Sequence, residues 1–130
     1  MIIFKTTSEH LDAVRRNLKY ATDDIPTELK VGDSVLIQVT YLSEKQGPPK
    51  IRYAWKHYNS YEDKEGESFR LWGYQWRYII EGQRLCRLKH PFDIRDVQVT
   101  EKDYGSAQRY VYVAPEDERI IVREGLLVCW

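Results

Sequence analysis

The chain has 130 residues, the size of one ordinary domain, and its 42% hydrophobic and 31% charged residues suit a globular protein with one core. No apolar run approaches the roughly 20 residues that a membrane-spanning helix needs, so we expect no membrane partner. The formal net charge is zero, from 20 basic and 20 acidic residues, which argues against a tight non-specific DNA-binding domain, because such domains are usually strongly basic.

The N-terminal segment predicts a strand followed by a helix. Ile2–Thr6 is β-branched and aromatic and has no basic leader or small-residue cleavage site, so we interpret it as a first strand and expect a cytoplasmic protein. Thr7 and Ser8 are candidate N-caps for the helix. Helical spacing then gives one apolar stripe, formed by Leu11, Val14, Leu18 and Ala21.

The middle of the chain predicts a series of strands. Ser34–Leu42 and Ile51–Tyr58 alternate in polarity. Phe69–Glu81 is a long extended run with a bend expected at Gly73, and Gln83–Leu88 is a further short strand.

The last third of the chain is more varied. Pro91–Val97 predicts a helical turn or loop, and Arg109–Val113 predicts a strand. Residues 115–130 fit two structures. Pro115 and the three acids after it favour a helix, whereas the β-branched residues around Glu124-Gly125 fit a hairpin.

These elements predict one α+β domain over residues 1–130. We expect a small, strongly bent, mostly antiparallel sheet or an open β-barrel with one N-terminal helix packed at its side. Neither Cys86 nor Cys129 belongs to a C-x-x-C pair, so we expect two reduced thiols and no zinc site. No nucleophile motif or phosphate-binding glycine loop is present, and we predict no catalytic residue, no metal and no cofactor.

Two stretches resemble a known superfamily. LKVGDSVLI at 29–37 and RYIIEGQRLCRLKHPFDI at 77–94 resemble the PUA-like barrels, which include the PUA, ASCH, EVE and YTH domains. The resemblance implies an RNA- or base-binding fold, sometimes with an aromatic cage around a modified base. It also implies that the loop after the first helix reaches the pocket, which makes Asp23 a candidate for ligand contact.

The stretch RLWGYQWRY, residues 70–78, concentrates two tryptophans and two tyrosines. In a regular strand, Trp72, Tyr74, Trp76 and Tyr78 share one face and fill a small barrel as core. A second interpretation leaves Trp72, beside Arg70 and before the bend, free to stack on a base, a contact worth about 1–3 kcal/mol.

Charge is also unevenly spread. Residues 45–95 contain 11 basic and 6 acidic residues, a net charge of +5 that the rest of the chain balances. A local basic face of this kind fits limited phosphate contact.

We therefore predict non-enzymatic binding of nucleic acid or a nucleotide-like ligand, with a modified base among the candidates. The predicted ligand-binding residues are Tyr53, Trp55, Trp72, Tyr74 and Asp23, and the predicted phosphate-binding residues are Arg52, Lys56, Arg70 and Arg77. Two alternatives remain open. One is a small-molecule-binding or enzymatic barrel with an internal aromatic cavity, and the other is a structural protein that forms a homodimer through exposed rings.

Overall fold

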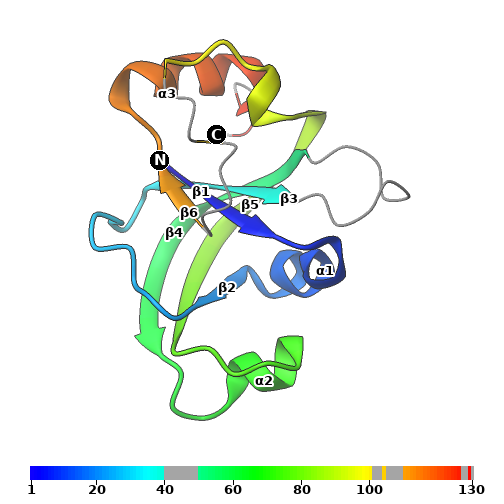
Figure 1. Ribbon diagram of the computed structural model, residues 1–130, viewed down its shortest axis with the longest axis vertical. Helices are drawn as coiled ribbons and strands as arrows, with labels where there is room; N and C mark the ends of the chain where they lie inside the picture. The colour runs from blue at the N-terminus through cyan, green and yellow to red at the C-terminus, as the bar shows by residue number, and fades with distance from the viewer. Residues whose placement is uncertain (40–49, 101–103, 105–109, 127–128, 130) are drawn as a thin grey trace.

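The computed structural model describes residues 1–39, 50–100, 104, 110–126 and 129 (Figure 1). The strands are β1 (Ile2–Thr6), β2 (Lys19–Thr22), β3 (Ser34–Val39), β4 (Ile51–Glu62), β5 (Tyr78–Phe92) and β6 (Tyr110–Tyr112). The helices are α1 (Ser8–Asn17), α2 (Glu67–Trp72) and α3 (Pro115–Ile121), with a 3-10 turn η2 (Ile94–Asp96) and a π-helical turn η4 (Val122–Leu126). Within these residues no helix has the length and apolar character to cross a membrane.

The strands form one mixed sheet in the order β2-β5-β4-β3-β1-β6. β1 and β3 run parallel, and the other neighbouring pairs run antiparallel. The sheet is open, with β2 and β6 at its edges. The predicted α+β class and mostly antiparallel sheet are confirmed, whereas the expectation of a single helix was too simple.

Apolar side chains cover both faces of the sheet. One cluster joins β1, β3, β4 and β5 to α1, and it includes Val14 and the fully buried Trp55. A second cluster lies on the opposite face under α3 and includes Leu88 and Ile121. Every residue of β1 is buried, as expected for a strand inside a sheet that is covered on both faces. Figure 1 shows α3 above the sheet and α2 at the far end of β4 and β5.

The first helix forms as predicted but ends earlier. The Thr7 hydroxyl accepts a hydrogen bond from the His10 amide, which confirms Thr7 as the N-cap. Leu18 adopts a left-handed conformation with φ of 52° and ends α1. The chain then enters β2, a strand that the sequence pattern did not predict. Ala21 therefore belongs to β2 and not to the helical stripe.

The stretch RLWGYQWRY is not a strand. Its first three residues complete α2, Gly73 ends that helix with φ of 77°, and β5 begins only at Tyr78. The predicted shared face of four rings was therefore wrong. The buried residues of this region are Ile79 and Ile80 in β5, while Trp76 and Tyr78 are only half-buried.

Asp63 holds α2 in place. Its carboxylate accepts hydrogen bonds from the Glu67 and Ser68 amides, at 2.9 and 2.8 Å. It also accepts from the Ser68 hydroxyl at 2.6 Å and from the Gln75 side-chain amide at 2.9 Å. One carboxylate thus caps the helix N-terminus and ties the loop after the helix to it.

This cap predicts a loss of stability in acid. Desolvation works to raise the pKa of the Asp63 carboxyl, but the hydrogen bonds that it accepts outweigh this and hold the pKa well below its usual value. The stabilisation is therefore complete at neutral pH and is lost as pH falls below about 4, where the unfolded carboxyl begins to bind protons. We expect the urea midpoint of the wild type to fall more between pH 6 and pH 3 than that of Asp63→Asn. Glu65→Gln, in the same loop, serves as control, and equal falls in Asp63→Asn and the wild type would contradict the expectation.

The prediction of two reduced thiols was wrong, because Cys86 and Cys129 form a disulfide. Their Cα atoms lie 5.5 Å apart, an ordinary separation for a bridged pair. The bridge ties the C-terminal segment to β5, the strand in which Cys86 lies. Disulfides persist mainly in oxidising compartments. The predicted cytoplasmic location stays a prediction.

The C-terminal segment is helical over Pro115–Ile121, which confirms the helix and rules out a hairpin about Glu124-Gly125. Asp117, in the first turn, is completely buried. Its carboxylate accepts from Thr100, and from the hydroxyl of Tyr104 at 2.9 Å. This acid is therefore a structural group inside the molecule and not a solvated cap.

Candidate functional site

A pocket opens where β4 and β5 lose their regular pairing. Ile51 pairs with Phe92, and Tyr53 pairs with Arg87. Two steps along β4 therefore correspond to five steps along β5. The extra residues form a bulge in β5, and bulges of this kind bend a strand and redirect its side chains. Pro91 lies in this bulge, a position that tolerates a residue without a backbone N–H.

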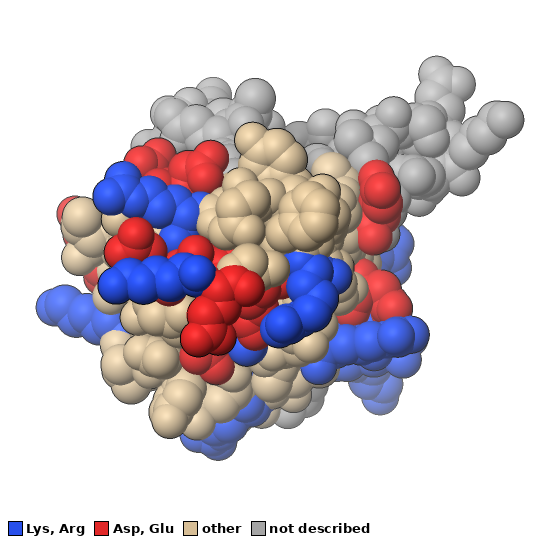
Figure 2. All heavy atoms as spheres, turned by 90° about the horizontal axis from the view of Figure 1, so that it is seen from below, with Lys and Arg blue, Asp and Glu red and all other residues tan. Residues whose placement is uncertain are grey.

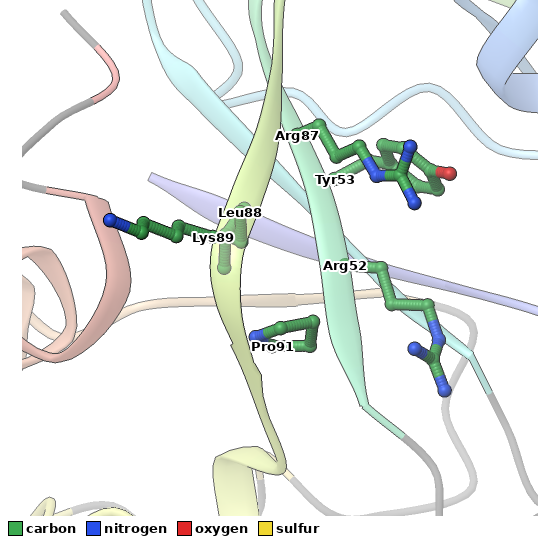
Figure 3. Close-up of a pocket in the computed structure, with 6 residues that line it drawn as sticks. All are labelled: Arg52, Tyr53, Arg87, Leu88, Lys89 and Pro91. Atoms are coloured by element: carbon green, nitrogen blue, oxygen red, sulfur yellow. The ribbon is translucent and has the colours of Figure 1, made fainter.

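The pocket has a volume of about 290 Å³. Its walls are Arg52, Tyr53, Arg87, Leu88, Lys89 and Pro91. Figure 3 shows the Arg87 guanidinium beside the Tyr53 ring, with Arg52 further along β4 on the same side. The Lys89 side chain extends to the other side of β5, so its ammonium group lies away from the two arginines.

The charge of the pocket is positive and unopposed. Among the described residues, the guanidinium groups of Arg52 and Arg87 take part in no ion pair or hydrogen bond. No carboxylate belongs to the described walls of the pocket. Two unpaired guanidinium groups beside one aromatic ring are suited to bind an anion that carries an apolar or planar group.

A third arginine supports the ring from α1. The Arg15 guanidinium lies over the Tyr53 ring, 5.9 Å from its centroid. Asp12 forms an ion pair with Arg15, and this contact raises the pKa of the Arg15 guanidinium. Arg15 is therefore already paired with a carboxylate, and its contribution beside the pocket is a cation–π contact with the Tyr53 ring.

Only two of the predicted site residues, Tyr53 and Arg52, line this pocket. Trp55 is completely buried between β4 and α1, which makes this ring part of the core. Lys56 lies four residues beyond Arg52 along β4, roughly 13 Å in an extended strand, and its ammonium group donates to the Ser34 hydroxyl at 2.8 Å.

Trp72 and Tyr74 belong to a second group of rings. Trp76 contacts Trp72 edge-on with centroids 6.0 Å apart, and Tyr74 at 4.8 Å. His10 contacts the same Trp76 ring edge-on at 6.0 Å. We call these four residues the aromatic cluster. Tyr74 is 58% exposed, and the nearby Phe69 is 62% exposed, so this surface is the one on which the homodimer hypothesis depends.

The aromatic cluster and the pocket lie on different sides of α1. His10 contacts the cluster, and Arg15 contacts Tyr53 of the pocket. An α-helix turns about 100° per residue, so these two positions point about 140° apart, with the buried Val14 between them. The single site predicted from the sequence is therefore divided into two surfaces. The alternative of an internal aromatic cavity stays a prediction: Tyr53 lines the pocket, Trp55 lies in the core and Trp76 belongs to the aromatic cluster.

The remaining predicted residues lie near α2 and not at the pocket. Arg70 is largely exposed and lies 4.0 Å from Glu67. Arg77 lies over the Tyr78 ring at 5.1 Å, and Asp23 accepts a hydrogen bond from the Arg77 amide. Figure 2 views the α2 end of the molecule and shows acidic and basic side chains intermingled there. This mixed surface is a poorer phosphate site than the pocket.

Sequence reasoning did not find Arg87, Arg15 or Pro91. Arg87 was one basic residue among eleven in its segment, and nothing in its neighbours distinguished it. Pro91 was a usable signal, because a proline inside a strand indicates an edge or a bulge. Among the described residues, no group of three or more His, Cys, Asp or Glu is placed to hold a metal ion.

In comparisons with known proteins, no family model matches the chain, and no curated protein matches it significantly. The function has to be inferred from the geometry of the pocket itself.

Proposed function

We propose that this chain is a single-domain PUA-like protein that binds nucleic acid or a nucleotide-like ligand without catalysing a reaction. The ligand's phosphate lies between Arg52 and Arg87, and its sugar or base contacts the Tyr53 ring. The observation that carries the proposal is the pair of unpaired guanidinium groups that line one pocket with this ring, Arg87 beside the ring and Arg52 further along β4 on the same side.

The chemistry of the pocket favours a ligand with a phosphate group over an apolar ligand. Guanidinium groups form paired hydrogen bonds with phosphate oxygens, and such charge-assisted bonds are about twice as strong as neutral ones. The site has few apolar walls, since only Tyr53, Leu88 and Pro91 contribute them. Most of the binding energy therefore has to come from the anion, and ring contact adds to it.

The proposal predicts that Arg52→Ala and Arg87→Ala each weaken binding of a labelled single-stranded oligonucleotide about 10- to 100-fold, the loss expected for a hydrogen bond to a charged group. Binding is measured by fluorescence anisotropy at low salt, with RNA, DNA and free nucleotides as ligands. Affinity should fall as salt rises, because phosphate contacts release counterions.

The matched controls are Arg70→Ala and Arg77→Ala, which remove the same charge from the α2 end of the molecule. In about 0.1 M salt they should leave the affinity within about twofold, because phosphate contacts depend little on charges beyond the screening length, which is about 10 Å at that ionic strength. Equal losses of affinity in all four variants would indicate non-specific electrostatic attraction and would contradict binding at the pocket. Failure of the wild type to bind any RNA, DNA or nucleotide would contradict the function as a whole.

A further inference from the structure

The pocket offers two positive charges that nothing described in the structure neutralises. Arg52 and Arg87 supply them, while Arg15 is paired with Asp12 and the Lys89 ammonium lies across β5. An internal phosphodiester of a nucleic acid carries one negative charge. A phosphomonoester carries between about 1.5 and 2 at neutral pH and has three strong acceptor oxygens. The charge of the pocket thus matches the monoester better than the diester.

The size of the pocket points the same way. Its volume of about 290 Å³ is just below the range of small-molecule sites, about 300–1,000 Å³. A pocket of this size in the bulge of one strand holds one small fragment and not a run of nucleotides. A terminal phosphate enters such a pocket with a single neighbour, whereas an internal phosphate brings nucleotides on both sides.

Resting on the proposed function, we infer that the pocket selects a phosphomonoester attached to a nucleoside, either a free nucleoside monophosphate or the phosphorylated end of a strand. Arg52 and Arg87 bind the phosphate oxygens from β4 and β5. The Tyr53 ring, which has the Arg15 guanidinium 5.9 Å from its centroid, contacts the attached nucleoside. Selection arises because a diester supplies only one negative charge, so in any complex with a diester one of the two guanidinium charges remains without a partner.

The test compares two oligonucleotides of one sequence that differ only in a 5′-phosphate or a 5′-hydroxyl. The wild-type protein should bind the phosphorylated strand at least 10-fold more tightly at low salt, by calorimetry or anisotropy. In Arg52→Ala and Arg87→Ala the difference between the strands should shrink to about twofold or less. Arg52→Lys keeps the charge but not the paired geometry, and it should retain only part of the preference.

Small ligands test the phosphate charge and the nucleoside contact separately. Adenosine monophosphate and its phosphate methyl ester share one nucleoside but differ by one negative charge, and the first should bind more tightly. Inorganic phosphate alone should bind more weakly than adenosine monophosphate, because it has no group for Tyr53. Equal binding of inorganic phosphate would overturn the nucleoside part of the inference and leave only a simple anion site.

The outcomes separate the two proposals. If both strands bind equally and still depend on Arg52 and Arg87, the monoester inference is wrong, while binding at the pocket stands. If neither strand nor any nucleotide binds, the proposed function itself is wrong. Circular dichroism and a urea midpoint for each variant confirm that the compared proteins are folded.

Discussion

Replacing Gly82 with alanine is expected to lower the free energy of unfolding by about 2–3 kcal/mol, within the usual cost of overpacking a core. A Cβ atom at this position would lie 2.3, 2.4 and 2.5 Å from three atoms of the Trp55 ring. That ring is completely buried, and close packing in a protein interior resists its displacement. The backbone cannot easily move either, because the Gly82 amide donates a 2.7 Å hydrogen bond to the Leu18 carbonyl and so ties β5 to the end of α1.

The measurement is urea unfolding of the wild type and Gly82→Ala. Gly73→Ala is the matched control, since its φ of 77° is strained for alanine but no atom lies within 4 Å of the new Cβ. It should cost only about 1–2 kcal/mol of backbone strain. In a Trp55→Leu background, where the ring is gone, the cost of Gly82→Ala should shrink markedly. An unchanged cost there would show that the ring contact is not the cause.

Reducing the Cys86–Cys129 disulfide is expected to lower the free energy of unfolding by about 4 kcal/mol. The bridge closes a loop of sequence separation 43, and the chain-entropy model gives about this loss for such a loop. In the oxidised protein, the bridge keeps Cys86 and Cys129 joined in the unfolded chain as well and so closes a loop there. Reduction opens this loop and enlarges the unfolded ensemble, so unfolding becomes more favourable.

Unfolding in urea with and without a thiol reductant measures this loss. Cys86→Ser should be as unstable as the reduced wild type, and the reductant should not change its midpoint. Thiol titration of the unfolded, unreduced protein gives an independent check, because the bridged chain has no free thiol among its two cysteines. Two titratable thiols in the protein as isolated would contradict the bridge.

The pocket adjoins this bridge, because Cys86 immediately precedes Arg87 in β5. Gly125 of η4 lies close to the same strand, where an added Cβ would be 2.5 Å from the Phe92 ring and 3.1 Å from Leu88. The C-terminal segment thus packs against β5 along the bulge that forms the pocket. If the proposed ligand binds in the pocket, the change in its affinity on reduction of the disulfide would measure how far this packing maintains the bulge.

Local signals in the sequence predicted much of the fold. Thr7 as N-cap, the stripe from Leu11 to Leu18 and the acids after Pro115 all predicted helices that the structure contains. The strands over 34–39, 51–58 and 110–112 were also expected from their alternation and β-branched residues. These features depend on hydrogen bonds and side-chain periodicity within a few residues of the chain, so the sequence carries them directly.

Other features depend on contacts between distant residues. The short α2 forms because Asp63, Ser68 and Gln75 bond to one another, and aromatic composition alone indicated a strand. The short strand β2 forms because it pairs with β5, which lies far from it in the sequence. No spacing between Cys86 and Cys129 indicated that they would meet.

The sequence by itself therefore determined the α+β class, the main strands, the two terminal helices and the presence of Tyr53 and Arg52 among the candidates. The tertiary structure alone decided which residues line the candidate pocket. It buried Trp55, moved Trp72 and Tyr74 to the far side of α1, and placed Arg87 opposite Tyr53. The reason is register: the bulge that forms the pocket depends on how many residues of β5 oppose each step of β4, and no local pattern in either strand specifies that number.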